Sequence, residues 1–452
     1  MSVINGRLQT PQGAPKSLIF DLPSSMINAT KTENRIQPYG QSKFETAGTV
    51  IRIVIPRTDR ALINPQTGYL VGKMAFTVPA GATAGTDQLY IIGSHYSMFS
   101  KQVISSNGRV LETIENPSQL ANVLFNTTLG YAQRLGLATT MGFSNSSSNV
   151  SYPINTSATA GIDNIGGSQK EFSFAICLLG LLNCNRQLPL INGDVTIELT
   201  LNSPSNYLLS NTAAGKAVIA TTTFAMTEVE YVVDQLTLTP ESYAMVMANY
   251  PERLYIKSQS YDYGSYGLAS GSSSQDIPVN IKRSSAKQMI VYFQDSRGTD
   301  GTYGGVNPNG DTLQFITNGV AYPSRGIKLH NPSEVFNQVQ KATGSLYSGD
   351  HCGNMDKYCF ARRMDANNFY TASVQTVTDG ENVGNKFYLI IDLETINYDS
   401  DSLYSGLALG VNSNFRLNCM SAIPSTANCY FWICYDAVIE MDLINGITSV
   451  IA

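Results

Sequence analysis

Two stretches of this 452-residue chain, about half its length apart, repeat the same order of local structural signals. An Asn-Gly pair, typical of a tight β-hairpin turn, occurs at Asn107-Gly108 and again 211 residues later at Asn318-Gly319. Helix starts and apolar strand-like runs recur at an offset of 215 residues, at Asn116 and Asn331 and at Phe172 and Phe387. Features in one order at nearly one offset indicate a duplicated domain. Two unrelated β domains with similar turn chemistry are the alternative.

The two helix starts share a capping pattern, Asn116-Pro117 in one and Asn331-Pro332 in the other. Each places Asn at the N-cap, Pro at the first helical position, and Gln or Glu two residues after the Pro. Asn can accept a hydrogen bond from an unpaired backbone N–H, and Pro loses no hydrogen bond at that position. The Gln or Glu side chain can reach back to the cap. We therefore expect two short helices at equivalent places in the two halves.

Strand signals dominate the rest of the chain. Residues Val195 to Leu201 alternate apolar and polar side chains, which is typical of a strand with one buried face. Similar runs, bounded by Gly, Asn, Pro or Ser, occur at 50–56, 387–393, 415–419 and 437–444. Such runs are the signature of β-sandwiches and barrels. The sequence predicts an all-β fold with few helices.

A third helix start, Thr239-Pro240, lies near the middle of the chain and predicts a helix to about Asn249. We expect this helix to link two domains. The predicted organisation is an N-terminal arm over residues 1–20, a first domain over 21–238 and a second over 239–452.

The composition favours a chain that packs against copies of itself. Charged residues make up 14% of the chain, against about 25% in ordinary globular proteins. The net charge is −5, so no basic field indicates nucleic-acid binding. No signal peptide is recognisable at the N-terminus, and the seven cysteines form no disulfide framework. We expect a product made inside the cell, with reduced thiols.

Residues with chemistry for a catalytic or metal site are few. His95 has no nucleophile motif around it, so an ordinary polar or half-buried histidine is expected. His351, Cys352 and Cys359 share one segment but do not make a four-ligand zinc site. Residues 295–301 lack the spacing of a calcium loop. We predict no enzyme activity, no metal and no cofactor.

Aromatic residues give two further expectations. Trp432, the single tryptophan, lies in an apolar strand run and should be buried in the core. The segment from Tyr261 to Gly267 is the better candidate for an exposed aromatic surface, in a subunit contact or a loop.

Three segments resemble the double jelly-roll major capsid proteins of eukaryotic double-stranded DNA viruses, the lineage of polinton-like viruses, virophages and the adenovirus hexon. The strongest is QFITNGVAYPSRGIKLHNPSEVFNQVQKA at 314–342, in which Pro323 belongs to a Tyr-Pro-Ser-Arg run after the Asn-Gly turn. IPVNIKRSSAKQMIVYFQDS at 277–296 and FYLIIDLETINYDSDSLYSGLALGVNSNFRLNC at 387–419 are similar to other strands of that family.

The resemblance implies two tandem eight-stranded antiparallel jelly rolls. It implies that the chain forms pseudo-hexameric homotrimers that tile an icosahedral shell in the virion, beside penton and minor capsid or cement proteins. An internal membrane can lie beneath such a shell. No sequence-specific nucleic-acid binding is implied. A carbohydrate-binding or adhesive β-sandwich protein, such as a viral fibre or lectin, is the alternative function, and a β-sandwich hydrolase is a more distant one.

Overall fold

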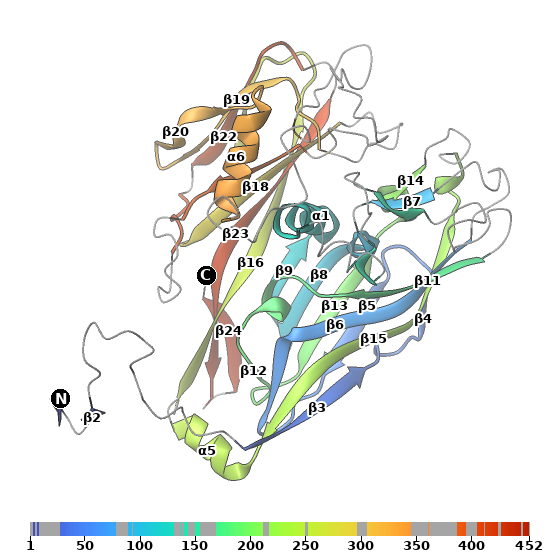
Figure 1. Cartoon of the computed structure of the whole chain (residues 1–452), viewed down its shortest axis with the longest axis vertical. Helices are drawn as coiled ribbons and strands as arrows, with labels where there is room; N and C mark the ends of the chain where they lie inside the picture. The colour runs from blue at the N-terminus through green and yellow to red at the C-terminus, as the bar shows by residue number, and fades with distance from the viewer. Residues whose placement is uncertain are drawn as a thin grey trace.

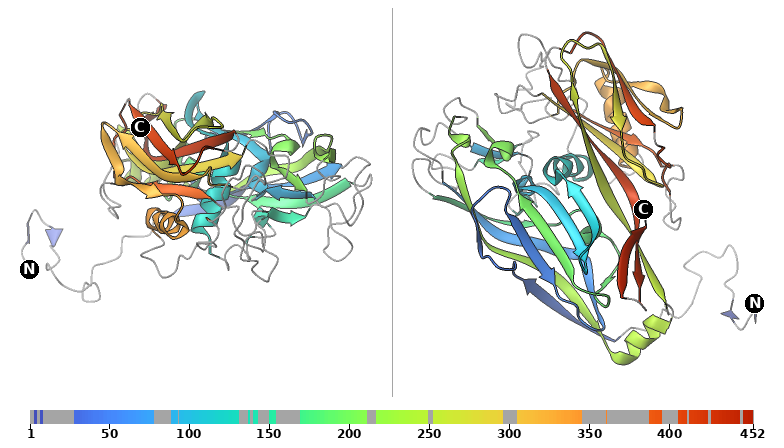
Figure 2. Two further views of the ribbon diagram at one scale, coloured as in Figure 1. Left: turned by 90° about the horizontal axis from the view of Figure 1, so that it is seen from above. Right: turned by 180° about the vertical axis from the view of Figure 1, so that it is seen from behind.

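Two β-sandwiches stand side by side in the computed structural model (Figure 1). Figure 2 shows the same arrangement from above and from behind. The structure describes residues 3–4, 7–8, 28–77, 89–92, 94–130, 137, 140–142, 150–153, 169–210, 217–248, 252–295, 305–344, 360, 387–394, 405–410, 412–423, 426–443 and 446–451.

The first half of the chain forms two antiparallel sheets. One has the strand order β11-β6-β15-β3 and the other β5-β13-β8-β9. The strands are β3 (Ala29–Ile36), β5 (Val50–Ile55), β6 (Ala61–Thr77), β8 (Phe99–Ser106), β9 (Arg109–Glu115), β11 (Gln169–Ile176), β13 (Val195–Leu201) and β15 (Thr223–Leu238). Two short strands, β4 (Lys43–Phe44) and β12 (Leu188–Pro189), pair with β15 and β6.

The second half also forms two antiparallel sheets, with the orders β16-β23-β18-β21 and β17-β22-β19-β20. The strands are β16 (Arg253–Leu268), β17 (Ser274–Val279), β18 (Ala286–Asp295), β19 (Gly310–Thr317), β20 (Val320–Lys328), β21 (Tyr388–Asp392), β22 (Ser413–Cys419) and β23 (Ala427–Asp442). The C-terminal strand β24 (Ile447–Ile451) pairs with β23.

The two halves have the same topology when these eight strands are counted along each. In both, the first, eighth, third and sixth strands form one sheet, and the second, seventh, fourth and fifth form the other. Phe172 lies in the sixth strand of the first half, and Phe387 directly precedes the sixth strand of the second. This order is that of a jelly roll. The predicted fold class, two tandem eight-stranded antiparallel jelly rolls, is confirmed.

The helices lie in the connections. Helix α1 (Pro117–Thr128) follows the fifth strand of the first half, and α6 (Pro332–Ala342) follows the fifth strand of the second. Helix α5 (Pro240–Ala248) joins β15 to β16. Smaller elements are the strand pair β1 (Val3–Ile4) and β2 (Arg7–Leu8), the sheet of β7 (Leu89–Ile92), β10 (Val150–Pro153) and β14 (Leu208–Ser210), the helix α3 (Pro204–Tyr207), and the 3₁₀ turns η2 (His95–Met98) and η3 (Gly180–Asn183). No helix in the described ranges is long and apolar enough to cross a membrane.

Strand β13 shows how the sequence builds a sandwich. Val195, Ile197 and Leu199 are at most 2% exposed, because successive side chains of a strand point to opposite faces and these share the inner one. Glu198, on the outer face, pairs with Arg52 of the neighbouring strand at 3.6 Å. The same inside–outside pattern in β5 makes one sheet of the first core.

Candidate functional site

Helix α1 lies between the two jelly rolls (Figures 1 and 2). Most of its residues are buried, including the polar Asn122 and Asn126. The Asn126 side-chain amide donates to the hydroxyl of Tyr388 in β21, at 3.1 Å. The Gln119 amide lies 3.4 Å from the side-chain oxygen of Gln294 in β18. Through these contacts α1 joins the first jelly roll to the outer face of the second.

That outer face is aromatic. Trp432 is fully buried, and its indole N–H donates to the backbone oxygen of Glu115 in β9 of the first half, at 3.2 Å. The tyrosine rings around it pack at centroid distances of 5.7 to 6.3 Å, in the pairs Tyr263–Trp432, Tyr292–Tyr388 and Tyr292–Tyr430. We call this surface and the α1–β9 side that covers it the inner seam. The predicted burial of Trp432 is confirmed, in a core shared by the two halves.

The prediction for the segment Tyr261 to Gly267 is wrong. These residues lie in β16 and pair with β23 along the whole strand, so the segment is not a loop, and its tyrosines do not form an exposed aromatic surface. Tyr261 and Tyr263 are partly buried against the core. The Ser, Asp and Gly residues between the tyrosines give this strand a loop-like composition. Tyr263 packs on Trp432 at the contact with the first half.

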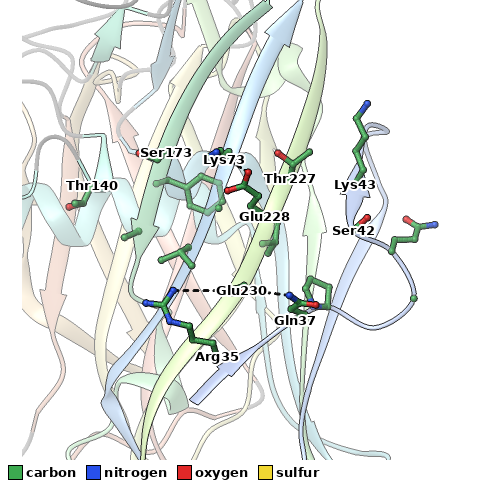
Figure 3. Close-up of a pocket in the computed structure, with 18 residues that line it drawn as sticks. Arg35, Gln37, Ser42, Lys43, Lys73, Thr140, Ser173, Thr227, Glu228 and Glu230 are labelled. Carbon is green, nitrogen blue, oxygen red and sulfur yellow. Dashed lines mark hydrogen bonds and ion pairs between the residues drawn. The ribbon is translucent and has the colours of Figure 1, made fainter. Parts of the chain in front are cut away.

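The equivalent sheet face of the first jelly roll has a different chemistry (Figure 3). It carries an open groove of about 1230 Å³ along β11, β6, β15 and β3. Lys73 pairs with Glu228 at 2.8 Å, and Arg35 lies 3.6 Å from Glu230, which also accepts from Gln37 at 3.4 Å. The Arg35 side chain is 59% exposed and that of Glu228 65%. We call this surface the polar face.

The predicted Asn-Gly turns close equivalent hairpins. Asn107 and Asn318 have φ of 49° and 52°, and the glycines that follow them, Gly108 and Gly319, have 74° and 76°. Two residues of positive φ make the turn that fits the twist of a two-residue hairpin, β8–β9 in one half and β19–β20 in the other. Both turns therefore have the conformation that the Asn-Gly pair indicates.

Each of these turns also packs on a glycine that sequence reasoning missed. The Asn107 side chain fills the place where a Cβ on Gly193 would lie, and Asn318 does the same at Gly410. Both glycines lie shortly before the seventh strand of their jelly roll. A side chain at either position would collide with the turn, so the repeat includes this contact too.

Helix α6 begins as its sequence indicates. The Asn331 side chain accepts a hydrogen bond from the backbone N–H of Ser333 at 3.2 Å, and Pro332 occupies the first helical turn. Glu334 differs from the expected pattern: it accepts from the backbone N–H of Lys328 at 3.1 Å and does not reach back to Asn331. The carboxylate thereby fixes the end of β20 to the helix start.

Helix α1 begins differently, and the capping prediction for Asn116 is wrong. Asn116 has left-handed φ and ψ of 52° and 48° and makes no side-chain cap hydrogen bond, although Pro117 follows it as expected. Its side-chain oxygen accepts from the Ser118 hydroxyl at 3.0 Å, and its amide donates to Gln119 at 2.8 Å. Its backbone N–H bonds to Ser100 of β8 at 2.9 Å. An N-cap residue normally has an extended backbone. Asn116 instead has a left-handed backbone, and its N–H bonds to a distant strand.

Pro323, the last of the predicted motif residues, lies within β20 and follows a cis peptide bond from Tyr322. Its strand is the fifth of the second jelly roll, equivalent to β9 of the first. The backbone oxygen of Pro323 lies 3.4 Å from the Gln314 amide of β19.

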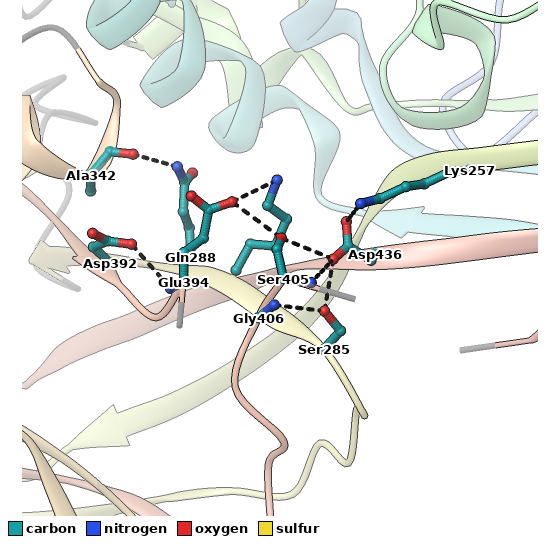
Figure 4. A network of polar contacts seen from close by, with 10 residues as sticks. Lys257, Ser285, Gln288, Ala342, Asp392, Glu394, Ser405, Gly406 and Asp436 are labelled. Atoms are coloured by element: carbon teal, nitrogen blue, oxygen red, sulfur yellow. Dashed lines mark hydrogen bonds and ion pairs between the residues drawn. The ribbon is translucent and has the colours of Figure 1, made fainter. Parts of the chain in front are cut away.

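The segments that carry the family resemblance meet in space, in a polar network of the second jelly roll (Figure 4). Its centre is Asp436 of β23, whose side chain is fully buried. The carboxylate accepts from the Ser285 hydroxyl at 2.7 Å and from the Ser405 backbone N–H at 3.1 Å, and it pairs with Lys257 at 3.4 Å. The Gly406 N–H donates to the Ser285 hydroxyl at 2.9 Å. Asp436 thus joins three chain segments, and sequence reasoning missed it.

A second part of this network ties α6 to the sheet. Lys287 pairs with Glu394 at 2.7 Å, and the Gln288 amide donates to the Ala342 backbone oxygen at the end of α6. Lys341 of α6 lies 3.9 Å from Asp392. Asp392 and Glu394, at the end of β21, and the Ser405-Gly406 pair therefore take part in the contacts that join α6 and these segments to the sheet.

His95 is buried more completely than expected, at 7% exposure. It stacks on Phe172 at 4.5 Å, and one ring nitrogen lies 3.2 Å from the Thr140 backbone oxygen. Burial lowers the pKa of His95 to about 4, so the ring is neutral near neutral pH. His351, Cys352, Cys359 and residues 296–301 lie outside the described residues. Among the residues that are described, no three His, Cys, Asp or Glu side chains gather as metal ligands.

No family model matches the sequence, and no curated protein matches it. Solved structures do match the fold. The chain is similar to PBCV-1 VP54 as fitted into a reconstruction of the virophage Sputnik, with a TM-score of 0.59 and 13% identity over 96% of this chain and 98% of that one.

Two further solved structures show the same likeness. The mavirus major capsid protein gives a TM-score of 0.57 and 12% identity, over 100% of this chain and 96% of that one. The Faustovirus major capsid protein gives 0.57 and 10%, over 93% and 92%. These matches extend over both jelly rolls and the connections between them. The chain therefore has the double jelly-roll fold of these viral major capsid proteins.

Proposed function

We propose that this chain is a major capsid protein, which self-assembles as pseudo-hexameric homotrimers that tile an icosahedral viral shell. The observation that carries the proposal is the contrast between the inner seam and the polar face. One sheet face of a duplicated fold is covered within the chain, and its equivalent in the other half bears an open groove. The chain covers only one of these two equivalent faces, and a second copy of the chain can cover the other.

The relation between the two halves suggests how copies meet. Within the chain, α1 and β9 of the first jelly roll cover the β16-β23-β18-β21 sheet of the second. Helix α6 and β20 are the equivalent elements of the second jelly roll. In the proposed trimer, α6 and β20 of one copy cover the polar face of the next. Three copies then form a ring of six jelly rolls.

The same proposal assigns the parts of the chain. Residues 21–238 and 239–452 form the two jelly rolls, and α5 links them. Residues 1–20 act as an arm along the base of the shell. The arm is the part that would contact neighbouring subunits or components beneath the shell.

The role is structural, without catalysis or a cofactor. The partners are other copies of the chain, then penton and minor capsid or cement proteins, and a membrane beneath the shell where the virus has one. The protein is made in the host-cell interior and resides in the virion. It reads no nucleic-acid sequence, consistent with a net charge of −5.

Electron microscopy of the purified, negatively stained protein tests this function. The proposal expects uniform particles of hexagonal outline with three identical subunits. Separate monomers that bind a glycan would favour the carbohydrate-binding alternative and overturn the capsid assignment. Monomers without any ligand, at high concentration and without a trimerising partner, would also overturn it.

A further inference from the structure

A buried carboxylate lies where the first jelly roll meets the second. Glu112 of β9 is 4% exposed, and both of its carboxylate oxygens lie 3.1 Å from the backbone N–H of Leu181 in η3. The turn η3 packs against β9, β6 and β16, so it touches both halves. Glu112 is therefore placed to hold the turn at the junction.

The chain around η3 is shaped to this carboxylate. Gly180 has a φ of 72°, and a Cβ there would lie about 2.2 Å from a Glu112 oxygen, so only glycine fits. The preceding residue is fixed from the other side: the Gln102 amide donates to the Leu179 oxygen at 2.9 Å, and the Leu179 N–H donates to the Tyr96 hydroxyl at 3.2 Å. All three polar side chains hold one short stretch of backbone.

The second half completes the enclosure. Ser260 of β16 is buried on this side of the junction, and its hydroxyl is near enough to influence the pKa of the Glu112 carboxyl. Four titratable groups interact electrostatically with Glu112, namely Tyr96 of η2, Cys184 directly after η3, Tyr261 of β16 and Tyr435 of β23. Burial raises the pKa of each of them, so all four are neutral near pH 7. Cations near these residues are paired elsewhere: Arg283, 4.0 Å over the Tyr435 ring, pairs with Asp262, Lys257 with Asp436 and Lys287 with Glu394.

A carboxylate enclosed by neutral groups resists ionisation. Burial raises the pKa of Glu112 from its ordinary 4.5 to about 7, against the opposing effect of the hydrogen bond from the Leu181 N–H and of the nearby polar side chains of Ser260 and Gln102. The carboxyl is thus neutral in mild acid and ionised in mild base. Ionisation places an unpaired charge in the junction, which is costly at a buried site.

We propose that Glu112 is a proton-operated latch, whose neutral form closes the junction of the two jelly rolls and whose ionised form loosens η3 and the β9–β16 contact. The latch acts within one chain, so it is independent of whether copies assemble. In a shell built from this chain, the junction within each subunit would be most stable in mild acid and less stable above neutral pH.

Trp432 provides the reporter, because it is the single tryptophan and its indole N–H is bonded to Glu115, three residues along β9 from Glu112. Its fluorescence emission is to be recorded for the full-length chain from pH 5 to pH 9. The latch predicts a reversible shift to longer wavelength with a midpoint near pH 7. The Glu112→Gln variant, which is neutral at every pH, should show no shift. The matched control Glu198→Gln, on an exposed strand face, should keep the wild-type shift.

The urea unfolding equilibrium supplies a second readout. The folded pKa lies above the unfolded one, so the stability from neutral Glu112 is fully present below pH 4.5 and is lost as pH rises through about 7. The unfolding constant should rise on the order of 100-fold across this window in the wild type, relative to Glu112→Gln. A wild type without an emission shift, or a Glu112→Gln variant with the same shift, would overturn the latch. If Glu112→Gln fails to fold, the wild-type emission midpoint decides alone.

Discussion

The two jelly rolls share one topology but differ in what their equivalent sheet faces present. In the second, the outer face of β16-β23-β18-β21 is aromatic and covered by α1 and β9 of the same chain. In the first, the outer face of β11-β6-β15-β3 carries Arg35, Lys73, Glu228 and Glu230 around an open groove. A face covered for the life of the chain can be apolar throughout, whereas a face that must stay soluble until a copy arrives needs polar groups. In the proposed trimer, the duplicated fold therefore serves one permanent contact within the chain and one that forms when copies assemble.

The two helices follow the same division. Helix α1 is mostly buried and bridges the halves, whereas α6 buries only Val335, Val339 and Ala342 and leaves its polar side outward. Their different starts fit these surroundings, because Asn116 is held by Ser100 of β8 while Asn331 uses its own side chain as a cap.

The largest expected effect is at the inner seam. Trp432→Ala should lower the free energy of unfolding by about 3–5 kcal/mol, because it empties a large buried site shared by both halves. Thr227→Ala, at the polar face, should change it by less than about 0.5 kcal/mol. Urea unfolding measures both. Equal losses at the two faces would remove the distinction between them.

The buried network around Asp436 should stabilise the fold more than an exposed ion pair of the same jelly roll does. Asp436→Ala should cost about 2–4 kcal/mol, because Lys257, Ser285 and Ser405 lose the carboxylate that they share. Asp276→Ala, which breaks an exposed pair with Arg416, should cost less than about 1 kcal/mol. A loss at Asp436 as small as that at Asp276 would show that the network does not stabilise the fold.

The first jelly roll should be the half that fails in acid. The folded pKa of His95 is about 4, below its ordinary 6.5. The contribution of neutral His95 to the free energy of unfolding is therefore fully present above pH 6.5 and is lost as pH falls through 4. The free energy of unfolding should fall by about 3 kcal/mol once the pH is below 4. His95→Phe keeps the stack on Phe172 and should flatten this acid limb in urea titrations at several pH values. An unchanged acid limb would exclude His95 as its source.

Substitutions at the two helix starts distinguish the energetic effect of a left-handed backbone, at Asn116, from that of a side-chain cap, at Asn331. Asn331→Ala should cost about 1 kcal/mol by removing the cap. Asn116→Ala should cost about 1–2 kcal/mol because alanine disfavours the left-handed conformation, and Asn116→Gly should restore most of that loss. Thermal unfolding of the three variants measures this. A failure of glycine to rescue position 116 would assign the loss to the Asn116 side-chain contacts.

Removing the proposed arm should have the smallest effect on stability. A chain lacking residues 2–20 should unfold like the full-length protein and still form trimers, yet assemble fewer closed particles. Particle counts by electron microscopy at matched trimer concentration measure the effect. Undiminished assembly would exclude the arm from the shell contacts.

Local patterns in the sequence account for much of the fold. The Asn-Gly turns, the Pro-led helices and the alternation of Val195 to Leu201 depend on neighbours in the chain, so they can be predicted from it. The left-handed Asn116, the buried Glu112 and the Asp436 network could not, because they depend on residues far away in sequence. Ser285 and Asp436, for example, are 151 positions apart. The chemistry of the two sheet faces likewise becomes visible only when the strands are aligned.

The mass of the purified chain in solution, by sedimentation equilibrium, tests the central claim most directly when it is measured with and without an obstruction on the polar face. The wild type should have about three times the 49.0 kDa of one chain. Thr227→Trp, which places a large side chain in the groove, should give a folded monomer, while Met245→Trp on exposed α5 should stay trimeric. A wild-type mass of 49.0 kDa, or a Thr227→Trp variant that remains trimeric, would contradict the claim that a second copy covers the polar face.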